Sequence, residues 1–191
     1  MAKKEILKER LERYRRAPEG MFQWVEENVC LPIYPEGSDI VVWTPVREFN
    51  NLPETASGRS YSKMWEEQKK ILREALRMEN GRFVYRLIVL CWMRGEGKSI
   101  LACLIKLWRF FCWQRMQIML GANSKEQVKF VHFDIMRDII NHSPGLLAQV
   151  GSRNIQEKEI RLKDKRGNVG SLIRSISSFS GIVSNITGYT F

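Results

Sequence analysis

The sequence is poor in the residues that bind metal ions or form disulfides. It contains two histidines and four cysteines among 191 residues, and no two cysteines form a Cys-x-x-Cys pair. His132 and His142 have no partner at metal-ligand spacing, so we predict no zinc site. Three of the four cysteines fall in apolar stretches, which is typical of buried thiols in a reducing compartment.

Long apolar runs are also lacking. No run reaches the roughly 20 residues that span a membrane, and the N-terminus lacks the apolar segment of a signal peptide. We therefore expect a soluble, intracellular protein with no membrane partner. Acidic residues are scarce relative to basic ones, with 21 Asp and Glu against 31 Lys and Arg. The net charge of +10 favours an anionic partner such as nucleic acid or a nucleotide, although a soluble basic protein has the same composition.

What is present is the composition of a globular domain, with 44% hydrophobic and 27% charged residues. Residues 3 to 16 predict a basic amphipathic helix, with Leu7, Leu11 and Tyr14 at helical spacing. Its polar face is either simply solvated or a contact for DNA or a partner. A short second helix and a long loop over residues 44 to 60 follow.

The most informative stretch is a predicted strand, turn and helix in succession. Leu87 to Leu90 predicts a buried strand, residues 95 to 99 form a glycine-bearing turn, and Ile100 to Trp113 predicts a buried helix. Glycines and a helix N-terminus together bind phosphate, with Lys98 on the β- and γ-phosphates and the Ser99 hydroxyl on Mg²⁺. The plainer alternative is a strand-to-helix turn with a solvated lysine.

Gln68 is a second candidate for nucleotide binding. It follows Met64 by four residues, on the apolar face of a helix that Ser62 is predicted to cap. A side-chain amide can both donate to and accept from an adenine edge. The alternative is a glutamine that is bound to nearby backbone.

The second half of the chain predicts further α/β structure. Residues 117 to 122 predict a buried strand, and residues 128 to 141 predict a helix that is ended by Pro144. Ser124 and Gln127 have the spacing of a capping box. A β-hairpin is predicted over residues 159 to 176. This order of elements indicates a parallel sheet with right-handed crossovers.

Taken together, these stretches resemble the large terminase subunit of tailed bacteriophages over roughly residues 20 to 191. The resemblance rests on the glutamine helix at Trp65 to Gln68, and on the turn from Trp92 to Ser99, whose missing first glycine is normal in that family. It also rests on residues 121 to 127 and 141 to 144. Arg94 stands four residues before Lys98, where the family often has a functional arginine.

The resemblance implies a three-layer P-loop NTPase of the ASCE type, with a mainly parallel central sheet, N-terminal helices and a β-hairpin near the C-terminus. Residues 1 to 60 would pack on an ATPase core formed by residues 61 to 191. Arg94 and Lys98 would be catalytic, with Arg94 acting on the γ-phosphate unless it is a plain surface arginine. The nucleotide-binding set implied is Gln68, Arg94, Gly95, Glu96, Gly97, Lys98, Ser99 and Ile100.

The implied activity is an ATPase that uses ATP and Mg²⁺ to drive viral DNA into proheads in the host cell cytoplasm. Its partners would be double-stranded DNA, the portal protein, the small terminase subunit and further copies of itself in a ring on the portal. No Walker B strand follows Ser99 in the sequence. We therefore expect an N-terminal fragment of a longer protein, truncated before Walker B and poorly active by itself; the alternative is a naturally short protein. The alternatives are another DNA-linked ATPase, such as a helicase or translocase, and a non-catalytic DNA-binding or assembly module.

Overall fold

A computed structural model describes residues 2–35, 39–54, 58, 60–91, 97–122, 132–164 and 167–177. The chain divides into two compact units, Met1–Val89 and Leu90–Phe191. Each unit has its own buried apolar residues, and each is described by itself below.

The first unit is mainly helical. Its elements are α1 (Ala2–Tyr14), α2 (Glu19–Asn28), β1 (Cys30–Ile33), β2 (Val42–Pro45), the 3₁₀ helix η1 (Val46–Asn51), α3 (Tyr61–Ala75), β3 (Met78–Glu79) and β4 (Arg82–Phe83). β1 pairs with β2, and β3 pairs with β4, both antiparallel. Both predicted N-terminal helices and the helix that carries Gln68 are therefore confirmed.

The core of the first unit lies between α2 and α3. The rings of Phe22 and Trp65 meet edge to face, with their centroids 6.0 Å apart. The Trp65 indole nitrogen donates a 2.9 Å hydrogen bond to Glu26, so this large ring is buried without losing its hydrogen bond. The predicted cap of α3 is wrong: Ser62 lies inside the helix, while Ser60 occupies the capping position without a side-chain capping bond.

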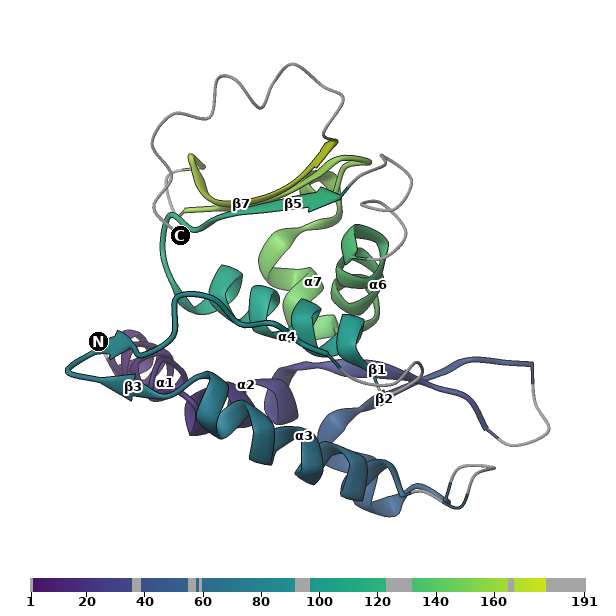
Figure 1. Ribbon diagram of the computed structural model, residues 1–191. Coiled ribbons are helices and arrows are strands. Elements are labelled where there is room, and N and C mark those ends of the chain that lie inside the picture. Colours follow the sequence, from purple (N-terminus) through teal and green to yellow (C-terminus); the bar gives the residue numbers. More distant parts are fainter. Residues whose placement is uncertain are drawn as a thin grey trace. The chain divides into compact units, whose positions relative to one another are not determined.

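The second unit is a three-stranded sheet with helices on one side (Figure 1). Its elements are α4 (Lys98–Cys112), β5 (Gln117–Ala122), α6 (Asp134–His142), α7 (Pro144–Val150), the 3₁₀ helix η3 (Ser152–Asn154), β6 (Glu159–Lys163) and β7 (Val169–Ser177). The strand order is β5-β7-β6, in which β7 runs parallel to β5 and antiparallel to β6. The predicted helix after Ser99, the strand at 117 to 122 and the hairpin are confirmed.

The predicted fold class is wrong. Among the described residues the sheets have two, two and three strands, and only β5 and β7 pair in parallel, so there is no central parallel sheet of a three-layer P-loop NTPase. The reason lies in the segment predicted as the first buried strand. Leu87 and Val89 are 80% and 77% exposed, and no strand includes them. An apolar run becomes a buried strand only if another strand pairs with it and other side chains pack over it. Within the described chain, this segment has neither.

A helix that the sequence did not predict follows α6. Pro144 ends α6, as expected, but it also stands in the first turn of α7. Proline is well suited to that position because the first amides of a helix have no acceptor within it. The predicted capping box at residues 124 to 127 lies outside the described residues.

Candidate phosphate-binding site

The candidate site lies at the N-terminal end of α4, directly after a glycine. Gly97 has φ 74° and ψ 15°, in the left-handed region that suits glycine. The helix begins at the next residue, and the Leu101 amide donates a 2.9 Å hydrogen bond to the Gly97 carbonyl. Backbone amides of the first turn of a helix point out of its N-terminal end, and the positive end of the helix dipole lies at the same place. This combination binds phosphate groups.

Packing of the rest of α4 holds this turn in place. The helix contacts β5, β7 and α6, and its buried side is made of large apolar residues, including Leu104, Leu107 and Trp108. Lys98, Ser99 and Ile100 are half-buried rather than covered. An anchored helix whose first turn remains accessible can bind a ligand without reorganising its own backbone.

The structure brings together only part of the predicted nucleotide site. Gly97, Lys98, Ser99 and Ile100 lie at the N-terminal end of α4, and their role in binding a nucleotide stays a prediction. The other predicted residues of this loop lie outside the described residues: Arg94, Gly95 and Glu96. Gln68 is half-buried on α3 of the first unit, so its role as an adenine reader stays a prediction.

The chemistry of this turn fits a nucleotide phosphate better than a free metal ion. Ser99 offers a hydroxyl as a single oxygen ligand, which suits Mg²⁺ that arrives already bound to phosphate. Within the described ranges, no three His, Cys, Asp or Glu side chains are grouped to hold a metal. Asp134 and Asp138, the acidic residues of α6, both form ion pairs with Arg137.

One cluster beside α4 brings a thiol next to an imidazole. The Cys103 sulfur lies 3.7 Å from His132 Nδ1 and 3.5 Å from the His132 carbonyl oxygen. Burial raises the pKa of the Cys103 thiol to about 12, so the nucleophilic thiolate does not form near neutral pH. Burial and the charge of Lys106 lower the pKa of His132, which keeps its ring neutral.

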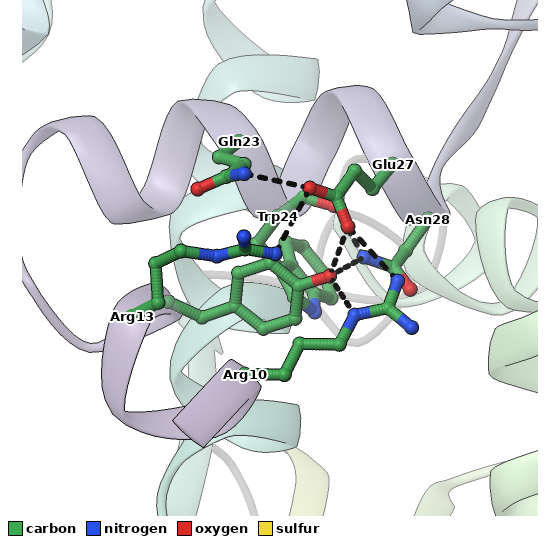
Figure 2. Close-up of polar contacts among 7 residues, drawn as sticks. Arg10, Arg13, Gln23, Trp24, Glu27 and Asn28 are labelled. Carbon is green, nitrogen blue, oxygen red and sulfur yellow. Dashed lines mark hydrogen bonds and ion pairs between the residues drawn. The ribbon is translucent and has the colours of Figure 1, made fainter. Parts of the chain in front are cut away.

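The basic helix α1 was the other candidate for a DNA or partner contact. Two of its arginines instead face Glu27 of α2, with Arg10 Nη2 at 2.9 Å and Arg13 Nη2 at 3.3 Å from the carboxylate (Figure 2). Tyr14 and Gln23 also donate to that carboxylate. Two of the five basic residues of α1 are therefore used to fasten α1 to α2.

Comparisons with protein-family models, with curated proteins and with solved structures find no match to this chain. No described helix is both long and apolar enough to cross a membrane. The assignment of function therefore depends on the residues and the geometry above.

Proposed function

We propose that the chain binds ATP through the turn from Gly97 to Ile100. The observation that carries the proposal is that α4 begins at Lys98, directly after a glycine in the left-handed conformation. A glycine turn, a lysine and a hydroxyl residue in that order at a helix N-terminus supply backbone donors, a mobile positive charge and a Mg²⁺ ligand within four residues. A site that binds a nucleoside triphosphate requires these groups.

Each predicted residue has a part in this proposal. Lys98 binds the β- and γ-phosphates, and the Ser99 hydroxyl holds the Mg²⁺ that accompanies them. The amides from Gly95 to Ile100 surround the phosphate oxygens, Gln68 reads the adenine, and Arg94 stabilises charge on the transferring phosphoryl group.

The wider role that we propose is the ATP-driven motor of viral DNA packaging in the host cell cytoplasm. The support is the resemblance of the glutamine helix and the glycine-lysine-serine turn to large terminase subunits, together with the net charge of +10. In that role the chain works with double-stranded DNA, the portal protein, the small terminase subunit and further copies of itself.

Titration of a fluorescent ATP analogue with Mg²⁺ tests the proposal. The Lys98→Ala variant should bind at least about tenfold more weakly, because hydrogen bonds to a charged group contribute roughly 1.5–3 kcal/mol. Lys158→Ala is the matched control, since it removes an exposed lysine from the same unit away from α4. Its affinity should equal that of the unmodified chain.

The outcomes separate the rival functions. Equal affinities for the unmodified chain and a folded Lys98→Ala variant would overturn the phosphate assignment. A chain that binds DNA but no ATP would be a non-catalytic DNA-binding or assembly module. Stimulation of ATP turnover by proheads would favour the packaging motor, whereas stimulation by DNA alone would favour a helicase or translocase.

A further inference from the structure

The positive charge of the chain is concentrated in the second unit. Residues 1 to 89 contain 16 Lys and Arg against 14 Asp and Glu, a net charge of +2. Residues 90 to 191 contain 15 Lys and Arg against 7 Asp and Glu, a net charge of +8. The second unit should therefore attract a polyanion more strongly than the first unit does.

The three-stranded sheet of that unit has one face under its helices. Leu120, Ile160 and Ile173 point to that side and are buried, at 3%, 0% and 0% exposed. Figure 1 shows α4, α6 and α7 on the same side of the sheet. Because side chains alternate along a strand, the residues between these positions point to the opposite face.

Three basic residues lie on or beside that opposite face. The Arg161 and Arg174 side chains are 39% and 44% exposed, and Lys163, at the end of β6, is exposed as well. We call Arg161, Lys163 and Arg174 the basic sheet face. They come from the paired strands β6 and β7, in which Arg161 lies opposite Leu172, two residues before Arg174. Lys163 follows an irregularity in this pairing and lies opposite Val169.

A single carboxylate orients the two arginines. Arg174 donates to Glu159 Oε2 from Nε at 3.2 Å and from Nη2 at 2.9 Å, while Arg161 contacts the other carboxylate oxygen. Burial alone would raise the pKa of Glu159, but the hydrogen bond from Arg174 and the charge of Arg161 outweigh it and lower that pKa. The Glu159 carboxylate thus orients the guanidinium groups of Arg161 and Arg174. Each guanidinium, with five N–H donors, keeps donors for a further anion.

We propose that the basic sheet face binds the phosphate backbone of double-stranded DNA. Positive side chains on a rigid, exposed sheet complement a row of phosphates. β5, β6 and β7 contain no Phe, Tyr or Trp, so they offer no platform on which unpaired bases could stack. The inference rests on the proposed function only for the choice of duplex DNA among polyanions.

The test measures the affinity of the full chain for a fluorescent 30-base-pair duplex by anisotropy at several salt concentrations. The double variant Arg161→Gln/Lys163→Gln leaves Arg174 on Glu159, so the buried carboxylate keeps a partner. We expect the duplex affinity to fall about tenfold at 0.1 M salt and the slope of log affinity against log salt to fall by about two. Lys63→Gln/Lys70→Gln, on exposed positions of α3, removes the same charge and should have a much smaller effect.

A second variant tests the same surface without removing any arginine. Glu159→Gln deletes the negative charge between Arg161 and Arg174 and should tighten duplex binding roughly threefold. Glu79→Gln, at an exposed site of the first unit, is its control and should change the affinity less. Unchanged affinity in Glu159→Gln, together with equal losses in the two double variants, would overturn the proposal.

Two further outcomes separate this inference from the proposed function. If the unmodified chain binds no ATP, yet duplex binding depends on the basic sheet face, the nucleotide assignment fails and the DNA surface stands. If ATP binding depends on Lys98 but the basic sheet face does not affect duplex binding, the surface is wrong. Tighter binding of single-stranded RNA than of duplex DNA, with the same sensitivity to Arg161→Gln/Lys163→Gln, would show that the partner class is wrong.

Discussion

The phenolic hydroxyl of Tyr14 donates a 2.6 Å hydrogen bond to Glu27 Oε2 and so joins the end of α1 to α2 (Figure 2). Arg10 donates from Nε to the same phenolic oxygen, also over 2.6 Å. Burial alone would raise the pKa of Glu27, but hydrogen bonds from Tyr14, Gln23 and Arg10 outweigh it and lower that pKa. The carboxylate therefore stays charged and serves as the acceptor that holds α1 in place.

Replacement of this carboxylate should loosen α1. We expect Glu27→Gln to lower the free energy of unfolding by about 1 kcal/mol, because hydrogen bonds to a charged acceptor are lost but the site is partly screened by solvent. The measurement is urea unfolding followed by circular dichroism. Glu12→Gln is the control, since its ion pair with Lys8 on α1 is well exposed and should contribute little. An equal effect of both substitutions would show that the Tyr14–Glu27 contact has no special role.

Acid should destabilise the fold through two carboxylates. The pKa values of Glu27 and Glu159 both lie below the ordinary value of 4.5, so the unfolded chain takes up protons before the folded chain does. Their contribution to stability is therefore complete above pH 4.5 and is lost as the pH falls through the lowered pKa values. Unfolding midpoints measured from pH 7 to pH 3 should drop on the acid side. The drop should be shallower in Glu27→Gln/Glu159→Gln, and an equally steep drop there would contradict the assignment.

The sequence correctly predicted those helices and strands that carry enough apolar residues of their own to be buried. The apolar run after Ser99 packs as α4, and residues 117 to 122 pair as β5, because enough apolar surface lies on each element to hold it against the others. The segment from Leu87 to Leu90 has the same local character but takes no part in a sheet. A strand depends on a partner that is distant in sequence, and its own composition cannot show whether that partner is present.

Contacts between residues that are distant in sequence also limited the prediction of the two candidate sites. The turn at Gly97 and Lys98 could be predicted because every residue that shapes it is adjacent in sequence. The cluster of Glu159, Arg161 and Arg174 could not, because Glu159 meets Arg174 through the register of two strands. The alternation of charged and apolar residues over β6 and β7 predicted a hairpin, but not which charges would face one another.

Cysteine reactivity should report the burial of α4. Cys103 and Cys112 are buried on α4, Cys30 is half-buried and Cys91 is exposed. Since burial raises the pKa of Cys103 to about 12, its thiolate is scarce at pH 8. A chromogenic disulfide reagent should therefore show one fast thiol, and Cys91→Ser should remove that phase. All four thiols should react quickly in denaturant, and fast labelling of Cys103 in the folded chain would contradict the packing of α4.

Gln68 offers the sharpest test of whether the chain recognises adenine. The glutamine is half-buried on α3, and the proposed role requires its amide to contact the base alone. Gln68→Ala should then lower the affinity for ATP about fivefold, which corresponds to the loss of one neutral hydrogen bond. The affinity for inorganic triphosphate should stay unchanged. Competition titrations against a fluorescent ATP analogue measure both affinities, and Glu67→Gln at the exposed neighbouring position is the control. Losses of the same size for ATP and for a nucleotide with a different base would identify Gln68 as a structural residue of α3. A loss confined to ATP would support Gln68 as the residue that reads the adenine.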